Sequence, residues 1–327
     1  MGKGKVVVLG VNGHIGRAVA EAFVAGGWDV TGMARSEKAP LAGVRFKGDS
    51  DSVADMRAAI DDADIVFSGL NLPYHKWFNG RLEAQLGRVL EAMGTSGKTL
   101  LFPASIYNFA ATDRVLTPDL PQHPEKPRGE VRMRIEQMIE AAAARGDIQA
   151  IIVRAGDFYG PSATGDWFDQ VMMTGARKGR VQTVGTSGVA HAWAYLPDLA
   201  NTFASLAAIR ANLGAFERFH FAGHFVTPEE MGAAIANAAP IPVTVSRFSW
   251  MLLRVFGLVD PLMREIGKMH YLWRNPMQLR DERLEALLGP DIGTPFQEAV
   301  AATVVPFFQP APGHAVPISS KPLRATV

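Results

Sequence analysis

The hydrophobic and polar positions near the N-terminus follow the pattern of a strand, a tight turn and a helix. Residues 6–9 are Val-Val-Val-Leu, an unbroken apolar run typical of a strand buried on both faces. Three glycines follow at positions 10, 13 and 16. The next apolar residues recur at helical spacing, at Ile15, Val19, Ala22 and Phe23. The stretch 5–24 is therefore predicted to form a strand–turn–helix unit.

The same alternation of apolar runs and helical patterns continues through the first 155 residues. Further strands are predicted at 28–33, 44–46, 64–68, 98–102 and 149–153. Helices are predicted at 53–60, 78–93 and 131–144, with a proline-rich loop at 112–128. Strands that alternate with helices are typical of a parallel sheet covered on both faces. We therefore predict an α/β fold built on a Rossmann-type doubly wound parallel sheet.

The pattern changes after Arg154. Gly, Pro, Asp and aromatic residues crowd positions 156–168. Helices are predicted near 197–209, 228–238, 246–257, 261–273, 281–288 and 295–307, with few strands between them. This pattern indicates a smaller, mostly helical C-terminal lobe. The predicted organisation is a nucleotide-binding domain at 1–155, joined by part of 181–210, a substrate lobe at 156–308, and a loose tail at 309–327.

Composition narrows the class of protein without identifying its partner. Hydrophobic residues make up 48% of the chain and charged residues 20%, which is typical of a soluble globular protein. The net charge of +1 gives no reason to expect nucleic acid or an anionic membrane surface. There is no cysteine, which excludes disulfides, thiolate metal sites and cysteine nucleophiles and fits a cytoplasmic location. No apolar stretch approaches about 18 residues, so no membrane span is predicted.

The three glycines of the opening turn indicate a nucleotide site. Glycine permits unusual backbone angles and lets the main chain approach a pyrophosphate, which binds the free N–H groups at a helix start. The spacing here is G-x-x-G-x-x-G rather than G-x-G-x-x-G. An ordinary tight turn is the alternative, but the strand before it and the helix after it favour a cofactor. We assign cofactor binding to Gly10, Asn12, Gly13, His14, Ile15 and Gly16.

Residues after the second and third predicted strands bear on the choice of cofactor. An acid after the second strand accepts from the 2′-hydroxyl of NAD, whereas an arginine pairs with the 2′-phosphate of NADP. Arg35 and Ser36 stand at that point, so NADP is predicted as the preferred cofactor. Glu37 keeps NAD as an alternative, and a solvated surface arginine is the structural alternative. Asp49 is a candidate acceptor for the adenine amino group, or else a simple turn residue.

Five segments together resemble a known superfamily. They are LGVNGHIG at 9–16, GDSD at 48–51, PASIYNF at 103–109, VRAGDFYGP at 153–161 and HAWAYLPDLA at 191–200. In this order they resemble the extended or atypical branch of the short-chain dehydrogenase/reductase superfamily, in the style of the NAD-dependent epimerases and dehydratases. The resemblance covers most of the chain to residue 240. It implies a Rossmann domain with the cofactor at the glycine turn and the substrate under a C-terminal lobe.

The sequence departs from that superfamily at the residues that carry out its chemistry. Such enzymes use a serine or threonine, a tyrosine as acid/base, and a lysine four residues later that lowers the tyrosine pKa. The position of the hydroxyl residue, four before Tyr107, holds Pro103. The Y-x-x-x-K-x-x-x-E pattern is replaced by Arg128, Arg132 and Glu136, and no Y-x-x-x-K occurs in the chain.

We take Tyr107, Arg128 and Arg132 as candidate catalytic residues. Arg132 can donate to the ribose hydroxyls of the cofactor, but arginine cannot shuttle protons near neutral pH. Arg128 either binds a carboxylate or phosphate of the substrate or pairs with a neighbouring acid. Tyr107 is a replacement acid in one interpretation, whereas the resemblance implies a mainly structural tyrosine at this position.

Candidate substrate contacts follow the predicted strands at their carboxyl ends, where open α/β sheets bind ligands. They are Asn71, Tyr74 and Trp77 after the strand at 64–68, and Asp157 and Tyr159 after the strand at 149–153. His191 is a further candidate, because its imidazole can exchange protons near neutral pH. A histidine packed between the lobes is the alternative. The histidines show no metal-ligand spacing and G-x-S-x-G is absent, so no metal site and no serine hydrolase is predicted.

Two hypotheses of function follow. The first is an NAD(P)-dependent oxidoreductase or epimerase that transfers hydride at a carbonyl or hydroxyl carbon of a small molecule, with protons from Tyr107, His191 or water. The second is a non-catalytic NADP(H)-binding redox sensor or regulator, of the NmrA-like kind. The resemblance supports the second because some members of the superfamily keep the nucleotide site and lose the acid/base set. It also implies pairing into a homodimer through helices of the large domain.

Overall fold

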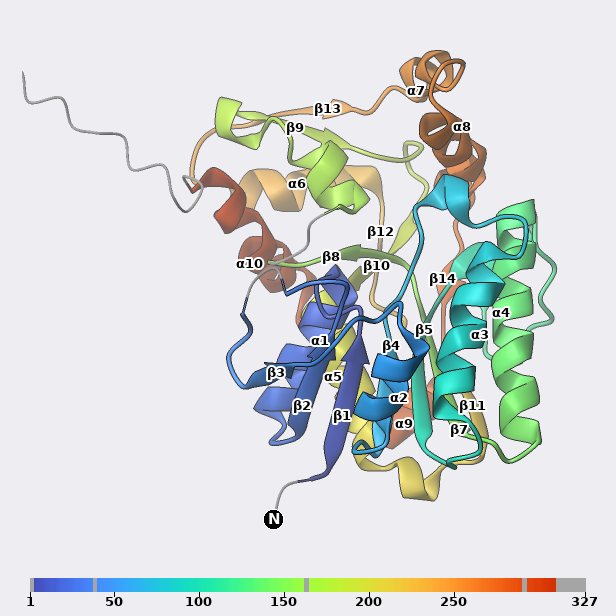
Figure 1. Ribbon diagram of the computed structural model, residues 1–327. Coiled ribbons are helices and arrows are strands. Elements are labelled where there is room, and N and C mark those ends of the chain that lie inside the picture. The colour runs from blue at the N-terminus through green and yellow to red at the C-terminus, as the bar shows by residue number, and fades with distance from the viewer. Residues whose placement is uncertain (1–2, 38–39, 162–164, 290–292, 310–327) are drawn as a thin grey trace, which may run out of the picture.

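A seven-stranded sheet, in which every pair of neighbours is parallel, forms the centre of the molecule. The computed structural model describes residues 3–37, 40–161, 165–289 and 293–309. The strands are β1 (Lys5–Leu9), β2 (Asp29–Met33), β3 (Val44–Phe46), β4 (Ile65–Ser68), β5 (Thr99–Ser105), β7 (Gln149–Ala155) and β11 (Phe216–His220). Their order is β11-β7-β5-β4-β1-β2-β3 (Figure 1). The predicted Rossmann-type doubly wound sheet is therefore confirmed.

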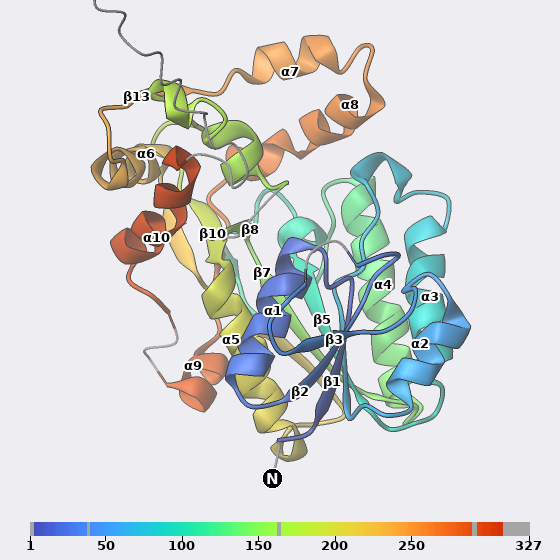
Figure 2. The same ribbon diagram turned by 60° about the vertical axis from the view of Figure 1, so that its left-hand side comes forward.

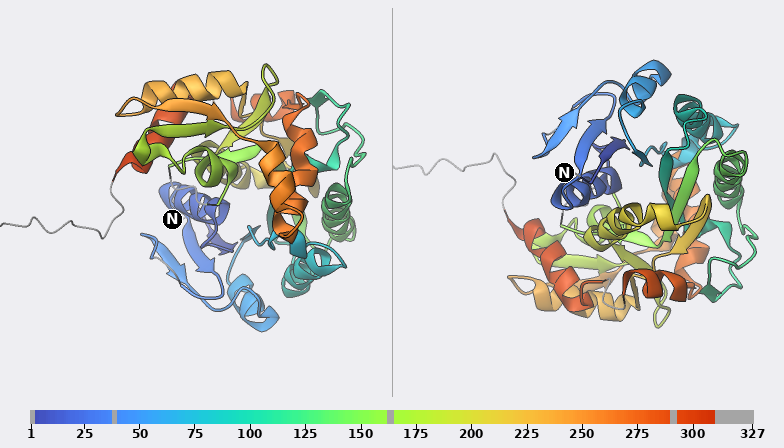
Figure 3. Two further views of the ribbon diagram at one scale, coloured as in Figure 1. Left: turned by 90° about the horizontal axis from the view of Figure 1, so that it is seen from above. Right: turned by 90° about the horizontal axis from the view of Figure 1, so that it is seen from below.

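Helices cover both faces of this sheet (Figure 2). One face carries α1 (His14–Ala25), α5 (Leu196–Ala208) and α9 (Glu282–Leu288). The other face carries α2 (Val53–Ile60), α3 (Arg81–Met93) and α4 (Pro127–Ala144). Views along the sheet from above and below show the same two layers (Figure 3). The first face is joined through contact between α1 and α5, two helices that lie far apart in the sequence.

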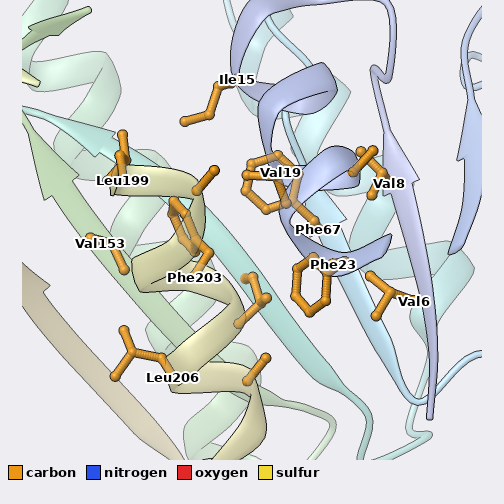
Figure 4. Close-up of a cluster of buried hydrophobic side chains, with 14 of the residues drawn as sticks. Val6, Val8, Ile15, Val19, Phe23, Phe67, Val153, Leu199, Phe203 and Leu206 are labelled. Carbon is orange, nitrogen blue, oxygen red and sulfur yellow. The ribbon is translucent and has the colours of Figure 1, made fainter. Parts of the chain in front are cut away.

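The core between α1, α5 and the sheet is built from the apolar positions that define these elements (Figure 4). Val19 and Phe23 of α1 are fully buried, as their helical spacing predicts. Phe67 of β4 packs edge-on against Phe203 of α5, with ring centroids 5.1 Å apart. Each large apolar side chain buried in this way stabilises the fold by about 1.5–3 kcal/mol. The same core fixes the carboxyl ends of β1 and β4, where the site lies.

The upper part of the molecule in Figure 1 contains short sheets as well as helices. A three-stranded sheet joins β8 (Asp157–Tyr159), β10 (His191–Tyr195) and β12 (His224–Val226), and a two-stranded sheet joins β9 (Arg180–Thr183) and β13 (Thr244–Arg247). The helices are α6 (Pro228–Ala238), α7 (Trp250–Phe256), α8 (Pro261–Gly267) and α10 (Phe296–Phe308). The mostly helical lobe was thus predicted with too few strands, because strands of three to five residues leave little periodicity in a sequence.

Several boundaries differ from the predicted ones for identifiable local reasons. The helix predicted at 246–257 begins only at Trp250, because residues 244–247 form β13 and Ser249 caps α7. The helix predicted at 261–273 ends at Gly267 and continues as a 3₁₀ helix, Lys268–Trp273. Helix α4 begins four residues before the predicted start, with Pro127 in its first turn, where proline needs no N–H acceptor.

The remaining short elements connect these layers. The loop predicted at 112–128 contains β6 (Val115–Leu116), which pairs with β14 (Gln278–Leu279). Helical turns lie at Tyr74–Lys76, Ile106–Asn108, Phe168–Met172, Ala176–Lys178 and Arg210–Asn212. None of the helices in the described ranges is long and apolar enough to cross a membrane.

The chain returns to the large sheet further along than the sequence predicts. From the sequence, only part of 181–210 is predicted to join the first domain. In the structure α5 packs on α1, and β11 then pairs with β7 from Phe216–Ala150 to His220–Arg154. Residues 196–220 therefore belong to the unit of the large sheet. Of the tail predicted at 309–327, only Gln309 lies within the described residues.

Candidate active site

The opening turn lies where the strand order of the sheet reverses, between β1 and β4. In open α/β sheets this point forms a crevice at the carboxyl ends of the strands and is the usual ligand site. Gly16, in the first turn of α1, packs directly against the backbone of Gly10. A Cβ on Gly16 would lie 2.3 Å from the Gly10 carbonyl oxygen, so no other residue fits. The glycine spacing is therefore a requirement of backbone packing as well as of ligand approach.

The N-terminus of α1 points into this crevice with its backbone groups uncapped. Gly13 is the N-cap residue, and no side chain accepts a hydrogen bond there. The first N–H groups of a helix have no acceptor within the helix, and with the helix dipole they favour an anion. Asn12 donates from Nδ2 to the Ser36 carbonyl oxygen at 2.6 Å, which ties the loop after β2 to the glycine turn. The turn has the form that a cofactor pyrophosphate requires.

His14 joins the glycine turn to the upper lobe. Its Nδ1 lies 2.6 Å from Oδ2 of Asp166. Burial alone would lower the pKa of His14, but the hydrogen bond and the charge of Asp166 outweigh it, and the pKa is raised above 6.5. Ile15, the next residue, is buried and forms part of the wall of a small cavity.

The predicted adenosine-side residues are exposed at the far end of this crevice. Arg35 makes no hydrogen bond or ion pair with any residue in the described ranges, and its guanidinium is in solvent. Asp49 follows β3, and its Oδ1 accepts a hydrogen bond from the Asp51 N–H at 2.9 Å. Asp49 thus already serves a turn, which was one of its two predicted roles.

A cavity of about 150 Å³ lies beside the glycine turn, at the carboxyl ends of β4, β5 and β7. Six of the predicted site residues form part of its wall: Ile15, Asn71, Tyr74, Trp77, Tyr107 and Asp157. Arg132 is a seventh. Strand β5 pairs with β4 only from Thr99 to Leu101 but with β7 as far as Ser105. The end of β5 therefore extends past β4, and Pro103 and Ser105 face the cavity.

Two tyrosine hydroxyls meet at the wall of this cavity. Oη of Tyr74 lies 3.0 Å from Oη of Tyr107. Burial raises the pKa of Tyr107 well above 10, and the nearby Tyr74 and Asp157 raise it further. Burial also raises the pKa of Tyr74. Both phenols are therefore protonated at neutral pH, and each can donate a hydrogen bond.

Tyr107 is placed there by close packing of two backbones. It lies in the helical turn after β5, against the first turn of α4. A Cβ on Gly129 would lie 2.0 Å from the Tyr107 carbonyl oxygen. Glycine is thus required where α4 approaches this turn, and no local sequence pattern around Gly129 indicates this requirement.

The two candidate arginines on α4 have different surroundings. Arg128 is 2% exposed, and its Nη2 lies 3.3 Å from the Glu265 carboxylate of α8. Its guanidinium stacks 4.5 Å from the centre of the Tyr74 ring. Of the two predicted roles for Arg128, the structure shows pairing with a neighbouring acid, and Arg128 is not part of the cavity wall. Arg128 contacts Tyr74 through both its guanidinium face and a hydrogen bond to the Tyr74 carbonyl oxygen.

Arg132, one turn further along α4, faces the cavity. Its Nη2 donates to the Pro103 carbonyl oxygen at 3.0 Å. Burial lowers the pKa of Arg132, although arginine still remains charged at neutral pH. Its position beside the end of β5 suits the predicted contact with a ribose hydroxyl.

Asp157 and His191 are brought together, whereas Tyr159 lies elsewhere. Nε2 of His191 lies 2.6 Å from Oδ2 of Asp157. The His191 ring is buried and stacks on Trp273 at 3.7 Å, so it packs between elements and reaches the cavity only through Asp157. Tyr159 is fully buried, with its hydroxyl 2.7 Å from His224, in the core of the upper lobe. The predicted substrate contact of Tyr159 is not made in the cavity.

The remaining predicted contacts follow β4. Asn71 and Trp77 both form part of the cavity wall, but their polar groups bind local backbone. Oδ1 of Asn71 accepts from its neighbour Leu72 at 2.9 Å, and Trp77 Nε1 donates to the Leu72 carbonyl oxygen at 2.7 Å. Trp77 therefore shapes the wall, and the Asn71 amide nitrogen is the group left for a ligand.

Ser105 is the functional candidate that the sequence analysis missed. Ser105 belongs to the cavity wall, and its Oγ is buried and has no hydrogen-bond partner among the described residues. A buried unpaired hydroxyl is costly, which points to a ligand atom as its partner. The segment PASIYNF contains this serine, but alignment with the superfamily pattern pointed to Pro103 instead. Counting along the sequence could not show that β5 extends past β4.

A buried charged network supports Ser105 from behind. Arg154 and Glu136 are almost completely buried. Nη2 of Arg154 donates to both carboxylate oxygens of Glu136, at 2.9 and 2.7 Å. Arg154 also donates to the Ser105 carbonyl oxygen. It further donates from Nε to Nε2 of His220 at 3.1 Å. Burial and the charge of Arg154 lower the pKa of His220 to about 3, so this histidine is neutral and can accept.

The described residues contain no group of three or more histidine, aspartate or glutamate side chains placed to hold a metal ion. Beside a turn suited to an organic cofactor, the cavity offers hydroxyls, the Arg132 guanidinium and the carboxylates of Asp157 and Asp166. The glycine turn fits a pyrophosphate, and the cavity next to it holds two phenols and an unpaired serine hydroxyl.

Comparisons with known proteins agree with this architecture. A model of the NAD dependent epimerase/dehydratase family matches residues 6–219. MoeE5 in complex with UDP-glucuronic acid and NAD superposes with a TM-score of 0.74 at 19% identity, over 92% of this chain and 98% of that chain. The UDP-glucose 4-epimerase of Thermus thermophilus in complex with NAD gives 0.70 at 18% identity, over 93% and 98%.

A third solved structure is similar to the same degree. The UDP-glucuronic acid 4-epimerase of Bacillus cereus, in complex with UDP-glucuronic acid and NAD, gives a TM-score of 0.71 at 13% identity, over 93% of this chain and 98% of that chain. At such identities the likeness to solved structures shows the fold alone. A search of curated protein sequences found no match.

Proposed function

This chain belongs to the NAD dependent epimerase/dehydratase family, and on that premise we propose that it is a nicotinamide-dependent reductase of small carbonyl compounds. The backbone of residues 10–16 would hold the pyrophosphate, and Arg132 the nicotinamide ribose. A bound nicotinamide would supply the hydride. The substrate carbonyl would lie in the small cavity at the end of β5.

The arrangement of hydroxyls around that cavity carries this proposal. Ser105 offers a buried Oγ with no partner among the described residues, and Tyr107 offers a phenol linked to a second phenol. Both residues belong to the wall of the same cavity, where hydroxyl donors to a carbonyl oxygen would stabilise the negative charge that develops there during reduction. This is the work of the serine and tyrosine of the superfamily, carried out from different positions in the chain.

The protonation of Tyr107 favours reduction over epimerisation. Carbonyl reduction needs a proton donor, whereas the oxidation that begins an epimerisation needs a base to remove a hydroxyl proton. Because burial and the nearby Tyr74 raise its pKa, Tyr107 keeps its proton at neutral pH and serves as a hydrogen-bond donor rather than as a base. No lysine lies four residues after it to lower that pKa.

For the cofactor we propose a preference for NADP over NAD. Support comes from Arg35, an exposed guanidinium after β2 without a partner among the described residues. A charge-assisted pair between arginine and phosphate contributes about 1.5–3 kcal/mol, or about ten- to a hundredfold in affinity. Arg35→Ala is therefore expected to weaken NADPH binding about tenfold or more and NADH binding little. Equal losses for both would remove the NADP preference.

Homodimeric assembly and a cytoplasmic location stay predictions.

A redox-responsive regulator is the second candidate. Arg128, at the position of the superfamily tyrosine, is tied to Glu265 of α8 in the upper lobe. This pair connects helix α4, which covers the large sheet, with α8 of the upper lobe. A regulator of this kind would bind NADPH tightly and turn over no carbonyl compound.

The decisive experiment is single-turnover reduction of a panel of aldehydes and ketones by the protein loaded with NADPH. Tyr107→Phe is expected to slow the chemical step by about 10²–10⁴-fold while NADPH affinity is unchanged. Tyr195→Phe is the matched control, because Tyr195 is also buried but lies in β10 away from the cavity wall. Tight NADPH binding without turnover on the whole panel would contradict the reductase and support the regulator.

A further inference from the structure

A second, larger cavity opens from the small one. Its volume is about 600 Å³, within the range of sites for drug-sized ligands. Tyr74, Asp157 and Asp166 belong to the walls of both cavities, so the two spaces adjoin. The far wall is formed by α7, α8 and the end of β13, which lie over the carboxyl ends of the sheet in Figure 1. We call this space the apolar pocket.

The wall of the apolar pocket consists mainly of large apolar side chains. Prominent among them are Trp167, Val171, Phe248, Leu252, Phe256 and Met263. Trp167 is the inner anchor, with its ring 5.4 Å from both Trp250 and Trp273. Aromatic side chains packed in this way give a wall that is rigid and apolar. The free energy of binding to such a wall becomes more favourable with the apolar area of the ligand that is removed from water.

The charges in the described part of this wall oppose a phosphate. They are the carboxylates of Asp157 and Asp166 and the guanidinium of Arg247. Arg247 is already engaged, at 3.0 Å from Glu229 and 2.7 Å from Ser187. A nucleotide diphosphate would bring two negative charges towards Asp157 and Asp166, each of which lies 2.6 Å from a histidine, and Nη2 of Arg247, the one cation of the described wall, is already bound to Glu229. An uncharged ligand meets no such penalty.

The pocket continues outward over an exposed apolar surface. Leu252 and Phe256 are part of its wall and are still 55% and 59% exposed. Arg264 holds this edge in place, since its guanidinium donates to the carbonyl oxygens of Gly257 at 2.9 Å and Leu258 at 3.2 Å. A ligand that covered Leu252 and Phe256 would bury apolar surface that is now in contact with water.

We propose that the substrate is a lipophilic aldehyde or ketone whose uncharged hydrocarbon part, an alkyl chain or ring system, fills the apolar pocket. The carbonyl group then lies beside Ser105 and Tyr107 in the adjoining small cavity. This inference rests on the proposed reductase function and names the substrate class of the same site. It also separates this chain from proteins that bind sugars through a nucleotide diphosphate.

The first test measures binding without turnover, on the full chain loaded with NADPH. The probes are primary alkanols of increasing chain length, which the protein cannot reduce, followed by calorimetry or tryptophan fluorescence. Each added methylene group is expected to tighten binding about three- to fourfold until the pocket is full. UDP-glucose is expected not to compete. A flat dependence on chain length, or displacement of the alkanols by UDP-glucose, would overturn the inference.

The second test uses a matched pair of variants on the same hairpin. Leu252→Glu places a charge on the wall of the apolar pocket and is expected to weaken binding of the longest alkanol about tenfold or more. Leu258→Glu is the control, because Leu258 is 76% exposed and outside the wall. Equal losses in both variants would show that the pocket is not the site.

Turnover provides the readout that separates this inference from the proposed function. With matching aldehydes, KM should fall with chain length while kcat stays nearly constant, as expected of binding that does not change in the transition state. Chain-length-dependent binding without any turnover would contradict the reductase but keep the ligand class. Turnover that does not depend on chain length would support the reductase and contradict the proposed ligand class.

Discussion

The glycine turn and the end of β5 face the same crevice, but they depend on their residues in different ways. At the turn, function needs backbone N–H groups and the absence of a Cβ, and Gly16 is required by a contact of 2.3 Å. At the small cavity, the proposed reduction needs hydroxyl groups, and Ser105, Tyr107 and Tyr74 in its wall offer these in place of positions 103 and 128. A backbone site is determined by local sequence, whereas a side-chain site can be rebuilt from neighbouring positions.

The largest expected effect concerns the support behind Ser105. Glu136→Gln removes one charge of the buried pair with Arg154 and should lower the free energy of unfolding by about 3–5 kcal/mol. Glu140→Gln on the same helix is the control, because Glu140 is half exposed and pairs with Arg218 at 3.4 Å, worth at most about 1 kcal/mol. Urea unfolding of both variants measures the difference. Similar losses would mean that the buried network is no special support for this side of the crevice.

The next effect tests the glycine turn. Gly16→Ala forces the start of α1 away from Gly10 and should weaken cofactor binding on the order of a hundredfold, since overpacking typically costs 1–3 kcal/mol or more. Gly87→Ala in α3 meets no atom within 4 Å and should stabilise the helix by about 0.5–1 kcal/mol. Fluorescence titration with NADPH measures the affinity of each variant. Normal affinity in Gly16→Ala would remove the cofactor site from this turn.

A smaller effect separates catalysis from folding at the end of β5. Ser105→Ala deletes an Oγ that has no partner among the described residues, so the free energy of unfolding should not fall. The rate of carbonyl reduction should nevertheless fall about tenfold or more, because a donor to the developing oxyanion is lost. A loss of stability without a loss of rate would show that the hydroxyl serves the fold alone.

The smallest effect is a dependence of stability on pH at the turn. The pKa of His14 is raised in the folded protein by Asp166. The stability from this pair is therefore fully present below the unfolded pKa of about 6.5 and is lost as the pH rises through the folded pKa. It should amount to about 1 kcal/mol or less, as for partly exposed pairs. Unfolding of wild type and His14→Gln between about pH 6 and pH 9 would show the difference, and parallel curves would contradict it.

The fold could be predicted from the sequence because the patterns that indicate it are local. The unbroken apolar run at 6–9 and the helical spacing of Val19 and Phe23 both report on burial within one element. The short strands of the upper lobe and β11 escaped prediction because their partners are distant in the sequence. Strand β11, for example, is defined by its register with β7, which no local pattern records.

The site was predictable to the extent that it follows strand ends. Asn71, Tyr74, Trp77 and Asp157, which that rule selects, all form part of the cavity wall, and their contact with a substrate stays a prediction. Tyr159 does not lie in the cavity wall. Its position after a strand does not predict the direction of its side chain, which is buried in an aromatic core. The apolar pocket was also out of reach, since it forms only where α7 and α8 meet the loop after β8.

The end of β5, which extends past β4, has a consequence for how the sequence of such a protein can change. Pro103 has no N–H to donate, yet it sits in a central strand, where proline normally breaks the sheet. Its carbonyl oxygen is bound by Arg132, on the side where β4 has already ended. Position 103 therefore has no partner in β4, although it still lies opposite Val153 of β7. New chemistry can be tried at this position by single substitutions, while the scaffold that carries the cofactor stays the same.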